Sequence, residues 1–339
     1  MTSNQTATIG TTRLGASGPQ VGRIGLGAMG MSGSYGKTDE TESITTIHAA
    51  LDSGATLIDT GDFYGNGHNE ALIHRALAQR PREDYQLSVK FGALRGPDGS
   101  FGGVDTRPVA MRNFLYYSLQ RLGVDHIDIY RPARLDPAVP IEDTVGAIAE
   151  MVEAGFVRHI GLSEIGAQTL RRAAAVAPIS DLQIEYALIS RDIEREILPT
   201  ARELGIGITA YGVLSRGLLS DAMRTKQSFA PDDFRAHSPR FQGENLTSNL
   251  RLVEALATIA ERHGVSVAQL AIAWVCSRGD DIVPLIGTSR VSRWNEAVAA
   301  TAIRLSAEEL AEIESAAPAD AVAGQRYPDA QMATLDSEN

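Results

Sequence analysis

Residues 126–163, HIDIYRPARLDPAVPIEDTVGAIAEMVEAGFVRHIGLS, indicate the fold of this 339-residue chain. The stretch begins and ends with the short runs 126–131 and 159–163, in which apolar residues do not alternate cleanly with polar ones. Strands that are buried on both faces have this composition. Between the runs, apolar residues recur at spacings of three and four, at Val145, Ile148 and Val152. The stretch therefore predicts two parallel strands joined by an amphipathic helix.

The same unit recurs along the chain. Six further strand candidates are residues 23–28, 56–60, 86–90, 182–187, 207–212 and 281–286. Eight strands that alternate with helices predict an α/β fold, a single closed (β/α)8 TIM barrel rather than an open sheet.

We expect one domain over residues 1–339, with a barrel over about 22–302 and a C-terminal helix and tail over 303–339. The turn signal GASG at residues 15–18 predicts an N-terminal β-hairpin over about 7–21. A long polar connection, residues 214–249, follows the seventh strand. Because loops after barrel strands surround the active site, we expect it to cover a cofactor or substrate. A mobile insertion without a role is the alternative.

The composition excludes several functional classes. A formal charge of −11 argues against general binding to nucleic acid or to an anionic membrane. The single cysteine, Cys276, excludes an intrachain disulfide. There is no apolar run of about 18 residues and no charged N-terminal segment followed by an apolar one, which predicts a cytoplasmic location. The oligomeric state stays open.

The run GLGAMG at residues 25–30 matches the glycine pattern of dinucleotide-binding turns. Such a turn opens a helix directly, so that the pyrophosphate lies on the helix N-terminus. Here the glycines lead into a loop, and the helical pattern begins only near Asp39. We therefore interpret the run as the first barrel strand leaving through a glycine loop.

Polar side chains follow the second and third strands. Asp59 ends the second strand, Tyr64 lies in the next loop, and Lys90 ends the third strand. Strand ends meet at one mouth of a barrel, so these three side chains are expected to lie together. A nearby ammonium favours the phenolate, and a carboxylate keeps the ammonium charged, so the set suits proton transfer by tyrosine. Asp62 is expected to be a surface loop acid.

These residues lie in a pattern that resembles the aldo-keto reductases over essentially the whole chain. The matching fragments are LIDTGDFYG at 57–65, SVK at 88–90, GLS at 161–163, QIEY at 183–186, AYGVLSRG at 210–217 and IGT at 286–288. The resemblance implies that Tyr64 is the general acid in reduction and the general base in oxidation. It implies that Lys90 and Asp59 adjust the acidity of Tyr64.

One position departs from the family pattern. The family usually has a histidine after the fourth strand, in a sequence like His-Arg-x-Asp-Pro, and Ala133 takes its place here. His126 lies at the start of that strand and is interpreted as structural. A water, Arg131 or Arg134 is expected to supply the missing hydrogen-bond donor, although salt-bridged rim arginines are the alternative.

The resemblance also implies an NADPH site without a metal. Ser163 and Gln183 would hold the nicotinamide carboxamide, and Tyr211 would stack on the nicotinamide ring. Arg290 and Arg293 near a helix start favour a 2′-phosphate and therefore NADPH over NADH. The full set of expected cofactor contacts is Met29, Ser163, Gln183, Tyr211, Leu214, Arg216, Gly217, Gly287, Thr288, Arg290, Arg293 and Glu296.

The expected function is NADPH-dependent reduction of an aldehyde or ketone to an alcohol. Physiological oxidation of an alcohol with NADP+ is one alternative, because one site serves both directions. A cofactor-binding regulatory subunit with little turnover is another, given the missing histidine. The identity of the carbonyl or alcohol substrate stays open.

Overall fold

The computed structural model describes residues 8–33, 36, 38–224, 229–230 and 233–338. Eight parallel strands close into a barrel, which confirms the predicted (β/α)8 architecture. In order around the barrel they are β3 (Gly25–Gly27), β4 (Leu57–Gly61), β5 (Gln86–Phe91), β8 (Ile127–Pro132), β9 (Val157–Ser163), β10 (Ile179–Glu185), β11 (Gly207–Tyr211) and β12 (Ile282–Gly287). Each predicted strand therefore exists, with ends displaced by a few residues.

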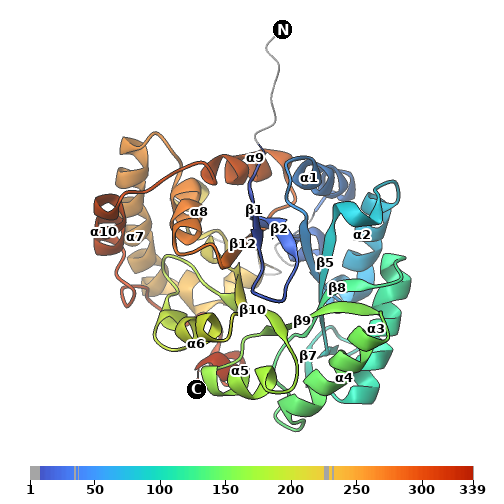
Figure 1. The fold of residues 1–339 in the computed structure, drawn as a ribbon. Helices are drawn as coiled ribbons and strands as arrows, with labels where there is room; N and C mark the ends of the chain where they lie inside the picture. Colours follow the sequence, from blue (N-terminus) through green and yellow to red (C-terminus); the bar gives the residue numbers. More distant parts are fainter. Residues whose placement is uncertain (1–7, 34–35, 37, 225–228, 231–232, 339) are drawn as a thin grey trace.

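Helices surround the barrel between successive strands (Figure 1). They are α1 (Glu40–Asp52), α2 (His68–Leu77), α3 (Pro108–Leu122), α4 (Ile141–Glu153), α5 (Ala167–Ala174), α6 (Ile197–Glu203), α7 (Gly243–Arg262), α8 (Val267–Ser277) and α9 (Val291–Ala300). Local signals set their ends: the Asp39 carboxylate accepts from the Glu42 amide at 2.9 Å, and Gly123 ends α3 with φ of 66°. The helices α10 (Ala307–Ala316) and α11 (Asp329–Met332) follow the barrel.

The predicted hairpin forms from β1 (Thr11–Arg13) and β2 (Gln20–Gly22) and covers the N-terminal end of the barrel (Figure 1). Its Leu14 and Val21 are fully buried against Leu57, Ile129 and neighbouring apolar residues. The Ala16 amide also donates to the Gly205 carbonyl at 2.7 Å. The hairpin therefore closes this end of the barrel.

Two elements differ from the sequence-based expectation. The long connection after β11 ends at Gln242 rather than at Asn249, because α7 begins at Gly243. Asn249 is buried within that helix, and its amide donates to the carbonyls of Arg240 and Ala323. After β5, an unpredicted hairpin of β6 (Ala93–Arg95) and β7 (Phe101–Val104) lies in the loop. Its glycines and polar residues obscured the strand signal.

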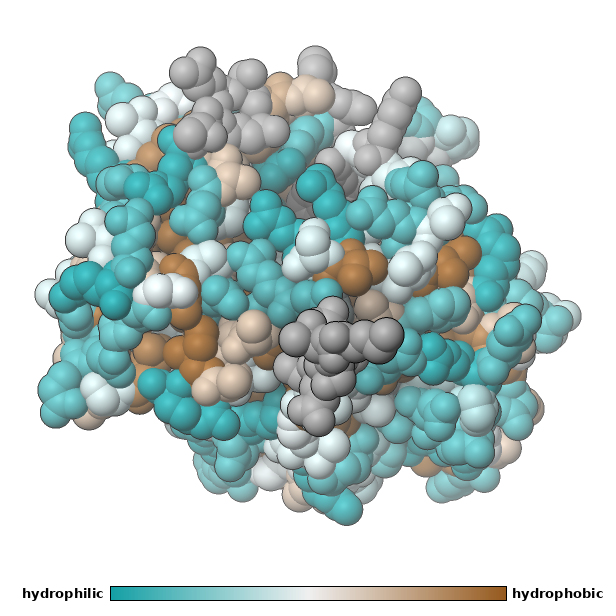
Figure 2. Space-filling model, turned by 90° about the horizontal axis from the view of Figure 1, so that it is seen from above, coloured by the Kyte–Doolittle hydropathy of each residue, from teal (hydrophilic) through white to brown (hydrophobic). Residues whose placement is uncertain are grey.

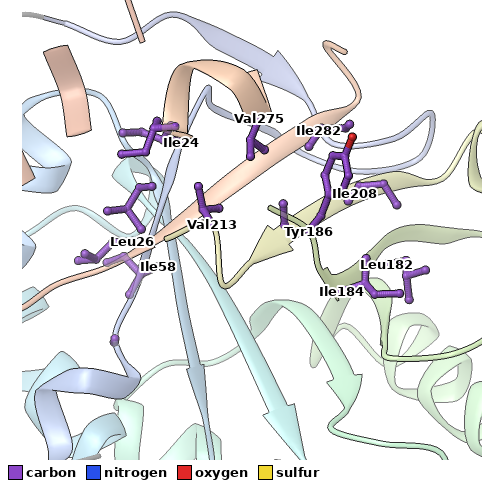
Figure 3. Packing of buried hydrophobic residues seen from close by; sticks show 14 of the residues in the cluster. Ile24, Leu26, Ile58, Leu182, Ile184, Tyr186, Ile208, Val213, Val275 and Ile282 are labelled. Carbon is purple, nitrogen blue, oxygen red and sulfur yellow. The ribbon is translucent and has the colours of Figure 1, made fainter. Parts of the chain in front are cut away.

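The barrel strands present alternate residues to two different environments. Leu57 and Ile129 belong to the apolar cluster inside the barrel, whereas Ile58 and Tyr130 belong to the larger cluster between strands and helices. Figure 3 shows part of this larger cluster, including Ile58. Nearer the carboxyl ends of the strands, the buried residues at interior positions are polar: Asp59, Ser88, Lys90, Arg131, Asp181, Gln183 and Thr209. The interior is thus apolar near the hairpin and charged near the mouth.

The outer surface carries mostly hydrophilic residues, with apolar ones in small separate groups on the face seen in Figure 2. Within the residues that the structure describes, no helix has the length and apolar character that crossing a membrane requires.

Candidate active site

The structure brings Asp59, Lys90 and Tyr64 together at the carboxyl ends of β4 and β5. Asp59 and Lys90 are each 4% exposed, and the Lys90 ammonium donates to Asp59 Oδ1 in an ion pair. The ammonium also lies over the Tyr64 ring, 5.1 Å from its centroid. Tyr64 is half-buried and begins the short turn Tyr64–Gly67 that leads into α2. The predicted cluster of carboxylate, ammonium and phenol therefore forms.

Asp59 is held from two further strands. The Ser88 hydroxyl of β5 and the Gln183 side-chain amide of β10 each donate to Asp59 Oδ2, both at 2.7 Å. Burial lowers the pKa of Lys90, the Asp59 carboxylate opposes that shift, and Arg131 and Arg134 add to it. The lysine is therefore a cation whose charge depends on Asp59, beside a tyrosine ring.

Ala133 lies directly after β8, where its amide donates to the Phe91 carbonyl at 2.8 Å. Arg131, two residues earlier, is fully buried inside the barrel. Its guanidinium donates to Asp181 Oδ2 at 2.8 Å and to Ser88 Oγ at 2.9 Å. The Arg131 side chain therefore points into the barrel interior and not to the rim, and its direct contact with substrate stays a prediction. His126, at the other end of this strand, bonds to Asp125 at 2.6 Å, in keeping with a structural role.

Arg134 remains at the mouth. It is half-buried, and it donates to the Ala133 carbonyl at 2.7 Å. Although burial alone would lower the pKa of this guanidinium, the nearby Tyr211, Tyr327, Glu164 and Tyr64 raise it above its ordinary value. Arg134 is thus a permanent cation close to Tyr64, as a substrate-contacting residue would need to be.

Asp62 is not the surface acid that the sequence predicted. It is half-buried, and its amide donates to the Lys90 carbonyl at 2.9 Å. Burial, and then repulsion from the buried Glu70, raise the pKa of Asp62 to about 7. The loop that carries Tyr64 therefore contains an acid that titrates near neutral pH.

The wall expected to hold the nicotinamide comes from β9, β10 and β11. Ser163 and Gln183 are neighbours in the register of β9 and β10, and the Ser163 hydroxyl is buried without a hydrogen-bond partner in the described part of the chain. Tyr211, at the end of β11, donates to Glu164 Oε1 at 2.7 Å. Burial and the Glu164 carboxylate raise the pKa of Tyr211 well above its ordinary value, so this phenol keeps its proton.

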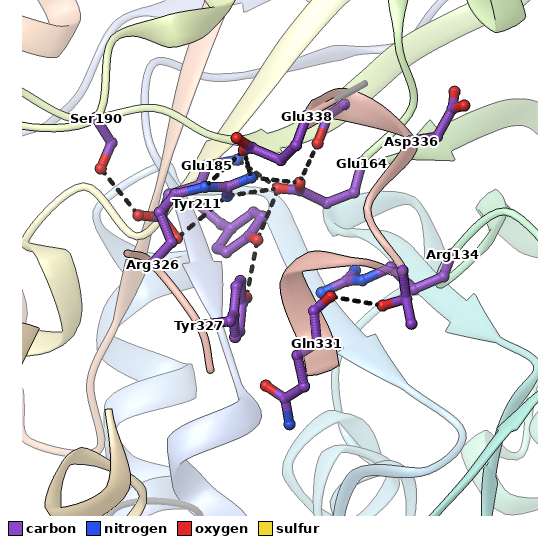
Figure 4. A network of polar contacts seen from close by, with 12 residues as sticks. Arg134, Glu164, Glu185, Ser190, Tyr211, Arg326, Tyr327, Gln331, Asp336 and Glu338 are labelled. Atoms are coloured by element: carbon purple, nitrogen blue, oxygen red, sulfur yellow. Dashed lines mark hydrogen bonds and ion pairs between the residues drawn. The ribbon is translucent and has the colours of Figure 1, made fainter. Parts of the chain in front are cut away.

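Residues 325–338, which we call the C-terminal arm, fold onto this wall (Figure 4). Arg326 is 7% exposed and donates to Glu164 at 2.9 Å, to Glu185 at 3.4 Å and to Glu338. The Ser337 hydroxyl donates to Glu164 at 2.7 Å. Although burial alone would raise the pKa of Glu164, Arg326 and Arg134 lower it to about 2. Glu164 is therefore an anion held by the arm.

Sequence reasoning assigned no role to Glu185, Arg326, Tyr327 or Glu338. The Tyr327 hydroxyl lies 3.0 Å from that of Tyr211, and the Arg216 guanidinium lies over the Tyr327 ring at 4.5 Å. More than a hundred residues separate Arg326 from its carboxylate partners Glu164 and Glu185, so no local motif connects them. An arginine in a tail otherwise rich in acids was the only available signal.

The remaining expected cofactor contacts lie around the same mouth. Met29 follows β3, Gly287 is the last residue of β12, and Thr288 follows it. Leu214 precedes three residues with positive φ: Ser215 at 45°, Arg216 at 58° and Gly217 at 88°. Successive amides in such a conformation form a concave site for anions.

The helix α9 begins at Val291 with exposed Arg290 as its N-cap, and no acid lies in its first turn. Its N-terminus is therefore open to an anion. Arg293 pairs with Glu296 at 3.1 Å, and Glu296 also accepts from Ser266 at 2.5 Å. Both residues of this pair are thus engaged within the protein, whereas Arg290 projects at the helix start.

The raised pKa of Asp62 predicts a pH-dependent gain in stability for Asp62→Asn. Ionisation of Asp62 opposes folding, so its unfavourable contribution grows as pH rises from its ordinary pKa of 3.8 to about 7 and is complete above that pH. We expect the variant to be more stable than the wild type by on the order of 2 kcal/mol at pH 8 and by little at pH 4.5. Urea unfolding at both pH values measures this. Asp98→Asn, at an exposed acid whose pKa is lowered by Ser100, is the control that shows no gain.

The ion pairs of Arg326 predict a large stability loss for Arg326→Leu. The substitution leaves two buried carboxylates without their shared partner, and we expect a cost of on the order of 3 kcal/mol in the free energy of unfolding. Arg195→Leu is the control, because its pair with Asp192 is 3.7 Å long with both side chains exposed. Equal losses in the two variants would contradict the importance of the buried network.

Comparisons with known proteins agree with this geometry. The Aldo/keto reductase family matches residues 23–318. A "Probable aldo-keto reductase 1" of Glycine max is 43% identical over 324 residues, which cover 95% of this chain and 92% of the relative. A glycerol dehydrogenase structure from Gluconobacter oxydans superimposes with a TM-score of 0.83 at 30% identity, over 91% of this chain and 96% of the other. An aldo-keto reductase from Bacillus halodurans in its holo form gives 0.76 at 26% identity, over 92% and 97% of the two chains. This chain belongs to the aldo/keto reductase family.

Proposed function

We propose that this oxidoreductase reduces a small aldehyde or ketone with NADPH and uses Tyr64 as the general acid. One observation carries the proposal: the buried Lys90–Asp59 ion pair lies directly against the Tyr64 ring at the mouth of the barrel. A carbonyl oxygen that gains negative charge needs a proton donor. A phenol beside an ammonium is acidic enough to supply that proton, and the carboxylate keeps the ammonium charged.

Tyr211 is the other phenol on this wall, and its environment supports a different role. Its hydroxyl donates a hydrogen bond to the Glu164 carboxylate, and the pKa of Tyr211 is raised. Tyr64 lies beside a cation instead, which makes Tyr64 the better acid.

The residues present fit a nicotinamide dinucleotide. The buried Ser163 hydroxyl, which has no hydrogen-bond partner among the described residues, lies beside Gln183 and offers a hydrogen bond to a carboxamide, and Tyr211 offers a ring face. Leu214, Arg216 and Gly217 would lie along the pyrophosphate, and Met29 would line the edge of the site. When bound, the cofactor supplies the hydride that the carbonyl carbon accepts.

The phosphate end of the cofactor would lie at the start of α9. Gly287 and Thr288 lead into this helix, whose N-terminus attracts an anion. Arg290 is exposed there and would bind a 2′-phosphate, while Arg293 and Glu296, already paired, would border the adenosine. The exposed position of Arg290 at the helix start favours NADPH over NADH.

Oxidation of an alcohol is the second candidate, because a similar structure is that of a glycerol dehydrogenase. The same residues would serve, with the Tyr64 phenolate accepting the alcohol proton. Arg134, a half-buried cation near Tyr64, would orient the polar substrate in either direction and replace the donor that Ala133 lacks.

The general-acid role predicts that Tyr64→Phe lowers kcat/KM for reduction of 4-nitrobenzaldehyde by about 10²- to 10⁴-fold while NADPH still binds. The loss of NADPH absorbance measures turnover, and fluorescence titration measures cofactor binding. Tyr116→Phe, at an exposed tyrosine of α3, is the matched control and should keep full activity. Undiminished activity in Tyr64→Phe would show that another group donates the proton.

The position of Arg290 predicts a cofactor-specific effect of Arg290→Ala. Loss of a charge-assisted contact to the 2′-phosphate should raise KM for NADPH by roughly tenfold or more and leave KM for NADH nearly unchanged. Steady-state kinetics with both cofactors separate these effects. Parallel changes for the two cofactors would argue that Arg290 does not contact the 2′-phosphate.

A further inference from the structure

Arg131 is a charged group inside the barrel that the proposed function leaves unexplained. It is fully buried on β8, and its register partner on β5 is Lys90. Its guanidinium bridges two side chains from other strands, Asp181 of β10 and Ser88 of β5. A buried cation requires a partner, and Asp181, itself fully buried, provides one. Pairing with Asp181 does not explain the contact with Ser88.

The direction of the Ser88 hydrogen bonds follows from the chemistry of its neighbours. A guanidinium only donates, so Ser88 Oγ accepts from Arg131. The single hydroxyl proton of Ser88 is then left for Asp59 Oδ2, 2.7 Å away. Asp59 accepts from Lys90 through its other oxygen. A continuous chain of polarised contacts thus runs from Arg131 through Ser88 and Asp59 to Lys90, which lies against Tyr64.

The barrel provides space for this arginine. A side-chain carbon at position 161 would lie 3.0 Å from the guanidinium carbon of Arg131 and 2.8 Å from Asp181 Oδ1. Gly161 on β9 therefore leaves the volume that the ion pair occupies. Thr209 of β11 and Ser180 also donate to the Asp181 carboxylate, which holds the far side of the pair.

We propose that Arg131 is a positioning residue for proton transfer: through Ser88 it fixes the orientation of Asp59, and its charge favours release of the Tyr64 proton. This inference rests on the proposed function, in which Tyr64 is the acid. It assigns Arg131 a role at the base of the catalytic cluster in place of the substrate contact that the sequence predicted.

The charges around Lys90 support the sign of the effect. The ammonium faces Asp59 from β4, Arg131 from β8, Arg134 beyond β8 and the Tyr64 ring, while the Gln183 amide of β10 holds Asp59. The Arg131 guanidinium lies between Asp181 and Ser88, so the positive end of that pair faces the catalytic cluster. Removing this charge leaves the cluster more negative, and removing the Ser88 hydroxyl leaves the Asp59 carboxylate with one fewer hydrogen bond to offset its charge. Both changes make the phenol less acidic.

The test is the pH dependence of kcat/KM for reduction of 4-nitrobenzaldehyde by NADPH. Reduction requires protonated Tyr64, so the rate falls at high pH along an alkaline limb. In Ser88→Ala this limb should move to higher pH by roughly one unit. The double variant Arg131→Met/Asp181→Asn should shift it in the same direction. It removes both charges of the pair, so that no unpaired charge remains inside the barrel, and it keeps an acceptor for Thr209.

Ser43→Ala is the matched control. It removes a buried hydroxyl that donates to the Asp39 carbonyl at 2.8 Å in the first turn of α1, outside the network of Arg131 and Asp181. Its alkaline limb should coincide with that of the wild type. An unchanged limb in both folded test variants overturns the proposal, and so does an equal shift in Ser43→Ala. If the residual activity of Tyr64→Phe still shows the same alkaline limb, the assignment of Tyr64 as general acid is wrong. The role proposed for Arg131 is then wrong as well, because it rests on that assignment.

Discussion

Charges inside the barrel must be paired, and this constraint organises the catalytic half of the molecule. Isolated ions in a protein interior are strongly unfavourable. Here Asp59 pairs with Lys90, and Arg131 pairs with Asp181, so four buried charges sum to zero. Ser88 and Gln183 both donate to the second oxygen of Asp59. The buried Lys90–Asp59 ion pair is tolerated because side chains from other strands donate hydrogen bonds to its carboxylate.

The same constraint applies to a second cluster at the mouth. Glu164 and Glu185 are buried carboxylates, and Arg216, Arg240 and Arg326 surround them. Because Arg326 comes from the C-terminal arm, pairing these acids fixes the end of the chain against the barrel (Figure 4). The buried Glu164 thus receives a basic partner from a distant segment of the chain. Cofactor wall and C-terminal arm form one network.

Two tyrosines at this mouth show how the environment assigns roles to identical side chains. Tyr64 lies beside an ammonium, whereas Tyr211 donates to a carboxylate. A cation favours the phenolate and an anion opposes it. Proton transfer is therefore expected of Tyr64, and a packing and hydrogen-bonding role of Tyr211.

The sequence by itself determined the eight strands, because strands buried on both faces and one-sided helices have periodic patterns that local residues express. It also determined the cluster of Asp59, Tyr64 and Lys90, since parallel strands end at one mouth of a barrel. Tertiary structure alone decided where the side chains of Arg131 and Asp62 lie. The alternation of residues along a strand predicts which face a side chain is on, but it does not predict which residues of other strands it will contact. It also decided the ion pairs of Arg326, which join segments more than a hundred residues apart. Such ion pairs form only when the folded chain brings opposite charges from distant segments together, and no local spacing in the sequence encodes them.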